Sequence, residues 1–417
     1  MYNLAIIGGG PAGYTAAERA LRAGMTVALF EQKTLGGTCL NEGCIPTKCL
    51  LYSAKQLHNA QVAQKYGVNI ADVRFDYARM QQRKTKVVRK LVAGVRQKIN
   101  SEQATLVTSP AVVRESDGHY VITAGGCDYE AERLLICTGS TNVTPPIAGI
   151  DLPHVWNSTD ALEATTLPQR IAIVGGGVIG TEFASLFNTL GVKVTIIEMM
   201  PEILGNMDNE ISALLRQSLV KDGITIHLGA RVTAITPSGF DFGVDGQSTS
   251  LEADNVLVSV GRRPNLSGIE SLMLDMQGRG LNVDSHMRTS LPNVWAAGDV
   301  TARVMLAHTA VRQAEVAVND MLGIDDEMRY DAIPSVVYTN PEVAGVGLTE
   351  QQATSQGMKV SIGRLPMSYA GRFVAENEGV NGLCKIISDD TDHIVGVHLL
   401  GNYASEIINQ AAQAISC

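Results

Sequence analysis

The sequence has no excess of basic residues and no long apolar run, and each absence excludes a class of function. Its 33 Lys and Arg residues are outnumbered by 42 Asp and Glu residues, which gives a net charge of −9. Because nucleic-acid-binding domains carry a basic footprint, we expect no nucleic-acid partner. No apolar run reaches the roughly 18 residues that a membrane-spanning helix needs, so we expect no membrane span.

Cysteine is also scarce, with seven residues in a chain of 417. This number is too low for the disulfide scaffold of a secreted protein. Met1-Tyr2-Asn3 leads directly into a predicted strand, so we expect neither a signal peptide nor a transit peptide. A cytoplasmic location follows from these expectations, and in the cytoplasm a disulfide is usually catalytic.

Two of the cysteines, Cys39 and Cys44, lie five positions apart in the glycine-flanked segment Gly36–Lys48. Pro46 suits the first turn of a helix, so we predict that a helix begins there. A thiolate at a helix N-terminus is stabilised by the helix dipole and by free N–H groups, and Lys48 adds positive charge. We therefore expect a redox dithiol in which the pKa of Cys44 is lowered. A metal site and two unrelated core cysteines are the alternatives. A zinc site needs about four ligands, however, and no second Cys/His pair has suitable spacing, so no metal ligand is expected.

The N-terminal segment has the pattern of a dinucleotide-binding unit. The short apolar run Leu4–Ile7 ends in the glycine-rich turn Gly8–Gly13, and we predict a helix over 14–23 and a strand over 27–31. The glycines allow a tight turn and the close approach of a pyrophosphate, which the helix N-terminus binds. Glu31, at the end of the second strand, can hold ribose hydroxyls.

The same pattern returns in the middle of the chain. Ile171–Val174 leads into Gly175–Gly180, and a helix and a strand over 192–198 follow. Two such units bind two nucleotides, or one nucleotide and a flavin dinucleotide. A carboxylate at the position of Glu198 accepts the 2′-OH of NAD and repels the 2′-phosphate of NADP. Because Met199-Met200 adds no positive charge, we predict that NAD is preferred over NADP.

The rest of the chain carries further predicted elements. The strand within Asn293–Asp299 ends in a Gly-Asp pair, and Asp299 can hydrogen-bond a ribityl chain; a turn-forming acid is the alternative reading. A helix is predicted over Met80–Glu102, and its many Lys and Arg residues most simply form a solvent-exposed face. A further helix is predicted from Thr309 to Leu322. From Pro334 onward, strands and short helices without a nucleotide motif predict an α+β domain.

Four features together carry a resemblance to a known family: the redox segment Cys39–Lys48, the two glycine-rich fingerprints, Ala297–Asp299 and Thr339–Glu342. Over essentially its whole length the chain resembles the pyridine nucleotide–disulfide oxidoreductases, and within them the members that oxidise dihydrolipoamide. The resemblance implies an α/β fold with two Rossmann-like dinucleotide-binding domains, for FAD and NAD, and a C-terminal α+β dimerisation domain. The expected domains are 1–143 for FAD binding and the redox disulfide, 144–264 for NAD binding, 265–332 for a central domain that completes the FAD site, and 333–417 for dimerisation.

The resemblance also implies a mechanism. Dihydrolipoamide attacks the Cys39–Cys44 disulfide at Cys39, Cys44 is released as a thiolate against the flavin, and electrons pass through FAD to NAD⁺. Lys48 is expected at the reactive flavin edge, and Glu182 matches the family's ion-pair partner for that lysine; a surface helix acid is the alternative reading of Glu182. The implied partners are a second copy of the chain and the lipoyl domains of 2-oxoacid dehydrogenase complexes or a glycine-cleavage carrier protein.

The expected cofactor contacts, besides Lys48, divide between the two nucleotides. Those on the FAD side are Gly8, Gly10, Pro11, Ala12, Gly13, Glu31, Gly37, Thr38, Thr138, Gly139, Ser140, Gly298, Asp299, Met305, Leu306, Ala307 and His308. Those on the NAD side are Gly175, Gly177, Val178, Ile179, Gly180, Glu198, Val232 and Gly261.

One part of the family pattern is missing from the sequence. Members carry a His-Pro-Thr motif with a following Glu near the C-terminus, donated across the dimer as the catalytic base and its orienting carboxylate. This sequence has no such motif and stops at Cys417, so a C-terminally truncated chain is the expectation. His308 is no substitute, because its segment resembles the family's flavin-contacting turn.

Several related functions compete with dihydrolipoamide oxidation. Glutathione-type reductases share the redox segment, but they use NADPH, and basic residues would be expected after the strand that carries Glu198. Mercuric reductases need an extra cysteine pair near the C-terminus, where Cys417 is single. A truncated flavoprotein with only an NADH–acceptor (diaphorase) activity or an assembly role is the remaining alternative.

Overall fold

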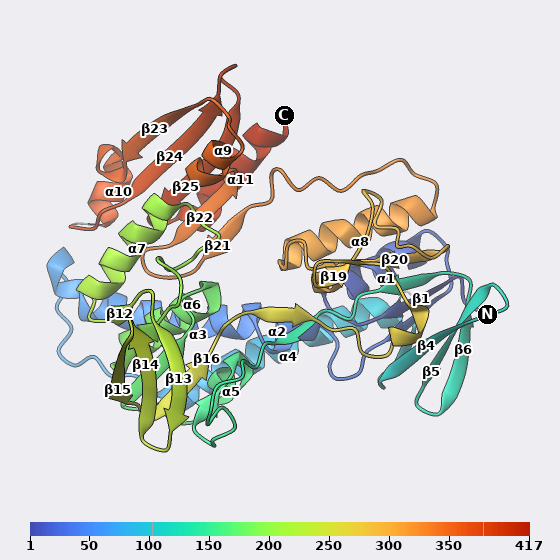
Figure 1. Cartoon of the computed structure of the whole chain (residues 1–417), viewed down its shortest axis with the longest axis horizontal. Helices are drawn as coiled ribbons and strands as arrows, with labels where there is room; N and C mark the ends of the chain where they lie inside the picture. The colour runs from blue at the N-terminus through green and yellow to red at the C-terminus, as the bar shows by residue number, and fades with distance from the viewer. Residues whose placement is uncertain (102, 378) are drawn as a thin grey trace. The chain divides into compact units, whose positions relative to one another are not determined.

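The computed structural model of the protein describes residues 1–101, 103–377 and 379–417. The chain divides into two compact units, whose helices and strands are labelled in Figure 1. The first unit consists of Met1–Pro46, Gln82–Val143 and Arg262–Arg329. The second unit consists of Thr47–Gln81, Thr144–Gly261 and Tyr330–Cys417. The boundaries of the four predicted domains stay a prediction.

The first unit is built on a parallel sheet with the strand order β20-β7-β1-β2-β3. Its strands are β1 (Leu4–Ile7), β2 (Val27–Phe30), β3 (Thr105–Val107), β7 (Leu134–Ile136) and β20 (Val294–Ala296). Every residue of β1, β2, β7 and β20 is buried, as expected for a parallel sheet covered on both faces. Helix α1 (Pro11–Arg22) packs against α8 (Ala307–Met321).

Smaller elements complete the first unit. A three-stranded antiparallel sheet, β4-β5-β6, and two short ribbons accompany the main sheet. These elements are β4 (Ala111–Ser116), β5 (His119–Ala124), β6 (Cys127–Ala131), β8 (Ser140–Asn142) paired with β17 (Arg262–Pro264), β18 (Met276–Gln277) paired with β19 (Gly280–Leu281), and the helix α2 (Gly37–Asn41). The long basic helix α4 (Tyr77–Ser101) leads into β3; Glu102, the last residue of the predicted helix, lies outside the described residues.

The second unit contains another parallel sheet, with the order β12-β11-β10-β16-β9. Its strands are β9 (Val155–Trp156), β10 (Arg170–Val174), β11 (Lys193–Ile197), β12 (Thr225–His227) and β16 (Asn255–Val258). The accompanying elements are α5 (Ser158–Glu163), α6 (Val178–Thr189), α7 (Asn209–Lys221) and the antiparallel strands β13 (Arg231–Thr236), β14 (Gly239–Val244) and β15 (Gln247–Glu252). Helix α3 (Cys44–Gln61) continues into this unit, where Leu50 and Leu57 belong to one core with Phe183 and Phe187 of α6.

The C-terminal part of the second unit is an α+β arrangement, as predicted. Its antiparallel sheet has the order β21-β22-β25-β24-β23. The strands are β21 (Ser335–Val337), β22 (Val343–Gly347), β23 (Val360–Pro366), β24 (Leu383–Asp389) and β25 (Ile394–Leu400), with helices α9 (Glu350–Ser355), α10 (Gly371–Glu376) and α11 (Ala404–Ser416). Ala404 and Ile408 of α11 bury against Val346 and Leu399 of this sheet.

Several predicted boundaries differ from those of the structure. Helix α1 begins at Pro11 rather than Tyr14, and α8 begins at Ala307 rather than Thr309, because each helix starts directly at its turn. The segment before Cys44, predicted as a turn, contains the short helix α2, and α3 begins at Cys44 rather than at Pro46. None of the helices in the described ranges is both long and apolar enough to cross a membrane.

Candidate functional site

The two glycine-rich turns have the same backbone geometry. The first glycine of each turn has a left-handed φ, +107° at Gly8 and +105° at Gly175. A Cβ on Gly13 would lie 1.8 Å from the carbonyl oxygen of Gly8, and a Cβ on Gly180 would lie 2.0 Å from that of Gly175. Only glycine therefore allows α1 and α6 to begin so close to β1 and β10, and the predicted repeat of one nucleotide-binding pattern is confirmed.

The third glycine of each turn is the N-cap residue of the helix that follows. Gly10 precedes α1 and Gly177 precedes α6, both in an extended conformation. Pro11 takes the first helical position of α1, where its missing N–H costs little. Among the described residues no side chain caps either helix, so the first-turn N–H groups are left for an anion such as a pyrophosphate.

An acid is held beside each turn by the protein backbone. Glu31 follows β2 and Glu198 follows β11, and each is 8% exposed. Glu31 accepts a hydrogen bond from the N–H of Gly9 at 2.9 Å, and Glu198 accepts one from the N–H of Gly176 at 2.6 Å. A second N–H, two residues after each acid, donates at 2.8 and 2.7 Å respectively. The carboxylates are thereby fixed in place and keep lone pairs for ribose hydroxyls.

The motif cysteines lie where α2 ends and α3 begins. Cys39 is within α2 and Cys44 is the first residue of α3, and both are partly exposed. The predicted position of Cys44 at a helix N-terminus is therefore observed. A Cβ on Gly37 would lie 2.7 Å from the Cα of Gly10, so α2 lies directly against the first glycine turn. Burial raises the pKa of Tyr14 in α1, and negative charge on the two cysteines raises it further.

A cluster of polar residues around Arg262 was not predicted from the sequence. Arg262 donates from Nε to Ser140 Oγ at 2.8 Å and from Nη1 to Asn142 Oδ1 at 2.6 Å. Ser140 Oγ also lies 2.5 Å from Asp299 Oδ2, and Arg262 Nη2 lies 3.4 Å from Thr38 Oγ1. The structure thus brings together three predicted flavin-side residues, Thr38, Ser140 and Asp299, around one guanidinium group.

Arg262 is a largely buried cation in the compact unit that also carries Cys39 and Cys44. Burial lowers the pKa of Arg262, while negative charge on Asp299, Glu42 and Cys44 raises it. The sequence signal that could have found Arg262 is a basic residue placed a few positions after the buried strand β16, in a ribbon rather than on a solvated helix.

The remaining residues that are predicted to contact the flavin lie in the same unit. Gly298 has φ +82° and donates its N–H to the buried Gln313 side chain at 2.7 Å, which orients the start of the Asp299 turn. Thr138 Oγ1 donates to the carbonyl of Asn265, and Gly139 accepts from the N–H of that residue at 2.9 Å. The segment at the N-terminus of α8 consists of Met305, of the N-cap residue Leu306, and of Ala307 and His308 in the first turn. Ala12 is buried in α1.

The second unit brings together the other two predicted catalytic residues. Lys48 Nζ lies 2.9 Å from Glu182 Oε2 and 3.0 Å from Oε1. The Glu182 side chain is only 5% exposed, so the alternative of a surface helix acid is wrong. The backbone N–H of Tyr338 donates to Glu182 Oε1 at 2.9 Å, and Lys48 Nζ lies 4.6 Å from the centre of the Tyr338 ring. The lysine charge is therefore held in one place by a carboxylate and an aromatic face.

The other residues that are predicted to contact NAD have different surroundings. Val178, at the first position of α6, is exposed, and Ile179 is partly buried. Val232 of β13 lies in an apolar core with Val174 and Ile197. Gly261 has φ +108° and ends this stretch of the second unit. Within the described ranges no group of three or more His, Cys, Asp or Glu residues could hold a metal ion.

Comparison with known proteins gives the family. Residues 2–314 match the family described as pyridine nucleotide-disulphide oxidoreductase, and residues 333–417 match its dimerisation domain. The chain belongs to the pyridine nucleotide-disulphide oxidoreductase family. The predicted fold class is thus confirmed, and the predicted cofactors, FAD and NAD, are those of this family. The dimerisation domain supports the predicted homodimer.

Relatives in this family match nearly the whole chain. Dihydrolipoyl dehydrogenases of Chlamydia muridarum and Bacillus subtilis are 38% and 37% identical to it, covering 99% and 98% of this chain and 90% and 91% of their own lengths. The solved structure of the HOCl-induced flavoprotein disulfide reductase RclA from Escherichia coli has a TM-score of 0.86 and 30% identity, covering 99% of this chain and 93% of that one. The residues observed here fit the family's cofactors, because each glycine turn presents an uncapped helix N-terminus and a fixed carboxylate.

Proposed function

We propose that the protein is a dihydrolipoyl dehydrogenase, which reoxidises protein-bound dihydrolipoamide and transfers the electrons through Cys39, Cys44 and FAD to NAD⁺. The observation that carries this proposal is the pair of motif cysteines, Cys39 in α2 and Cys44 at the first position of α3, in a chain with two nucleotide-binding turns. The dihydrolipoyl dehydrogenases at 37–38% identity support the choice of substrate.

In this reaction the two cysteines exchange with the substrate dithiol. One substrate thiolate attacks Sγ of Cys39, the Cys39–Cys44 bond breaks, and Cys44 leaves as a thiolate. The second substrate thiol then gives up its proton and attacks the mixed disulfide, so the lipoyl disulfide forms and Cys39 leaves as a thiolate that takes up this proton. The helix N-terminus at Cys44 stabilises the thiolate that results.

Other residues hold the cofactors and their charge. Bound FAD would supply a two-electron relay between the reduced cysteine pair and NAD⁺. The first glycine turn, Glu31 and Asp299 would hold FAD, and the second turn and Glu198 would hold NAD. We assign Lys48 the task of placing a positive charge at the cofactor, with Glu182 as the residue that fixes its position.

The finer choice of partner and location is also a proposal. The macromolecular partner is a lipoyl domain of a 2-oxoacid dehydrogenase complex or a glycine-cleavage carrier protein, in the cytoplasm. No partner is needed for the test. NADH-dependent reduction of free lipoamide, oxidised glutathione and mercuric ion is compared at mildly alkaline pH with the FAD-loaded protein. We expect lipoamide to be reduced fastest; faster reduction of glutathione or mercuric ion would replace the proposal with one of its competitors.

A change at Glu198 tests the proposed nucleotide. The wild-type protein should use NADH far better than NADPH, because Glu198 accepts the 2′-OH and repels a 2′-phosphate. Glu198→Ala should lower kcat/KM for NADH by about 10–100-fold, since hydrogen bonds to a charged group contribute roughly 1.5–3 kcal/mol. It should also reduce the preference over NADPH. Steady-state kinetics with both nucleotides and an artificial acceptor measure the effect.

The control is Glu252→Ala, which removes an exposed acid paired with Arg170 instead. This variant should keep the wild-type preference. A wild-type ratio of kcat/KM near unity for the two nucleotides would contradict the assignment of NAD.

A further inference from the structure

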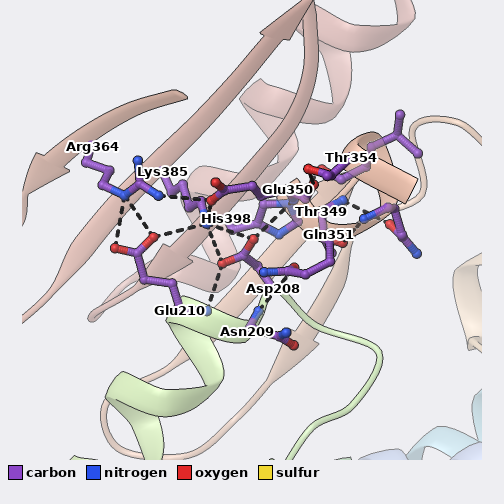
Figure 2. Close-up of polar contacts among 12 residues, drawn as sticks. Asp208, Asn209, Glu210, Thr349, Glu350, Gln351, Thr354, Arg364, Lys385 and His398 are labelled. Atoms are coloured by element: carbon purple, nitrogen blue, oxygen red, sulfur yellow. Dashed lines mark hydrogen bonds and ion pairs between the residues drawn. The ribbon is translucent and has the colours of Figure 1, made fainter. Parts of the chain in front are cut away.

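The second unit contains an ion-pair cluster that the chemistry described above does not use (Figure 2). At its centre is Lys385 of β24, whose side chain is fully buried. Lys385 Nζ lies 2.9 and 3.0 Å from the two carboxylate oxygens of Asp208, 3.0 Å from Glu210 Oε2 and 2.6 Å from Glu350 Oε2. Arg364 of β23 adds a second cation, at 2.9 Å from both Glu210 and Glu350. In Figure 2 these side chains converge on one point between α7 and the C-terminal sheet.

Asp208 and Glu210 both come from the nucleotide-binding part of the unit, and Asp208 is the one that is fully buried. It is the N-cap residue of α7, accepting the N–H of Glu210 at 3.1 Å. Its other oxygen accepts the N–H of Glu350 at 3.3 Å. The Asp208 carboxylate is fully buried, and Lys385 is the cation that hydrogen-bonds both of its oxygens, so loss of Lys385 would leave a buried charge uncompensated, which is strongly unfavourable. Lys385 therefore holds Asp208, and the start of α7 with it, in one position.

The segment 199–207 connects Glu198, the acid proposed to bind the ribose, with Asp208. The N–H of Leu204 in this segment donates to the carbonyl oxygen of Gly176 at 2.9 Å, so the segment contacts the NAD-side glycine turn. Leu204 is buried and has φ +52°, a left-handed conformation that is unfavourable for a branched residue. Such a conformation persists only where the surroundings impose it. One end of the segment is held through Glu198 and Gly176, and the other through Asp208 and Lys385.

We propose that Lys385 is a positioning residue for NAD: through Asp208 it keeps the segment 199–207, Glu198 and the second glycine turn in the arrangement that binds the adenosine half of the nucleotide. The inference rests on the proposed assignment of NAD to the second unit. Without the anchor at Asp208, Leu204 can relax from its left-handed conformation and withdraw its N–H from Gly176. Only part of the molecules then has a binding-competent turn, and the apparent Kd rises by the inverse of that fraction.

The test is the binding of ADP-ribose to the FAD-loaded protein, measured by calorimetry. ADP-ribose has the adenosine ribose and the pyrophosphate of NAD but no nicotinamide, so binding is measured apart from the reaction. Lys385→Met removes the charge but keeps an unbranched side chain. If about a tenth of the molecules stays competent, its Kd for ADP-ribose rises about 10-fold. The KM for NADH should rise in parallel, while kcat with an artificial acceptor at saturating NADH and the FAD content stay near wild type.

A second variant keeps the proposal testable if Lys385→Met folds poorly. Asp208→Asn removes the ion pair but retains a good N-cap residue for α7, and should also weaken ADP-ribose binding. The control for general destabilisation is Leu399→Ala, which opens the separate apolar core of the C-terminal sheet and should leave the Kd unchanged.

The outcomes separate this inference from the proposed function. Unchanged ADP-ribose binding in both Lys385→Met and Asp208→Asn overturns the positioning role. Equal weakening by Leu399→Ala overturns it as well, because loss of the C-terminal fold alone would then explain the effect. A wild-type protein that does not bind ADP-ribose overturns the proposed use of NAD together with this inference.

Discussion

Replacing Cys44 with serine is expected to reduce dihydrolipoamide oxidation to the uncatalysed level and to remove the long-wavelength absorbance of a thiolate beside a flavin. Cys44 is the residue at the N-terminus of α3, where the helix dipole and free N–H groups stabilise negative charge. A serine hydroxyl can form no disulfide, so the substrate thiolate has no disulfide to attack and the exchange cannot begin. The visible spectrum and the NAD⁺-dependent rate of the FAD-loaded variant measure the two effects.

Cys39→Ser is the matched variant that separates the roles of the two cysteines. It should lose turnover as completely as Cys44→Ser, but it should keep the long-wavelength absorbance, because Cys44 can still ionise. Cys127→Ser, which changes an exposed cysteine on β6, should keep both the rate and the spectrum of the wild type. Equal spectra from Cys39→Ser and Cys44→Ser would contradict the assignment of Cys44 as the thiolate next to the flavin.

The parts of the site that the sequence predicted are those with a local signal. Gly8 and Gly175 were recognised because each lies in a pattern of short spacing: a strand, a glycine-rich turn, a helix, a second strand and an acid. The structure repeats this geometry almost unchanged in both units. The start of α3 at Cys44 was predicted to within two residues, because Pro46 restricts where a helix can begin.

The ion pair between Lys48 and Glu182 is different, because it joins residues 134 positions apart. Neither residue has a periodic signal that points to the other. The pair was expected only from the resemblance to a family, and the structure then brought the two side chains within hydrogen-bonding distance. The exact helix starts were predicted wrongly because a helix can begin directly at a glycine turn. The first helical residues there do not show the apolar periodicity from which a helix is predicted.

The buried charges that were not predicted, Lys385 and Arg262, have partners to which no local signal points. Lys385 lies on the buried face of β24 together with Leu383 and Ile387. The alternation of a strand therefore places a charged residue at a core position, where an apolar residue is expected. Its partner Asp208 is 177 residues away. Arg262 contacts Ser140 from 122 residues away. Buried charges of this kind depend on tertiary pairing, which the order of residues along the chain does not reveal.

The second large effect concerns a catalytic base. A protein of these 417 residues is expected to oxidise dihydrolipoamide about 10²–10⁴-fold more slowly at neutral pH than one with a positioned base, which is the range that general bases contribute. A free thiol has a pKa of about 8.5, so only a few per cent is thiolate at pH 7. Cys39, Cys44, Lys48 and both glycine turns lie within the chain, so electron transfer from NADH to artificial acceptors should remain.

The pH dependence of the two reactions makes this prediction measurable. Without a base, the rate of dihydrolipoamide oxidation should follow ionisation of the substrate and rise about 10-fold per pH unit until the pH reaches the substrate's pKa, where it levels off. The rate with an artificial acceptor needs no substrate thiolate, so it serves as the control and should show no such rise. A C-terminal extension that carries the family's His and Glu should restore the rate at neutral pH, provided that the dimer forms. If the 417-residue protein already oxidises dihydrolipoamide at neutral pH as fast as the extended protein, then the base lies within this sequence, and the proton must be taken by a residue that the mechanism above does not name.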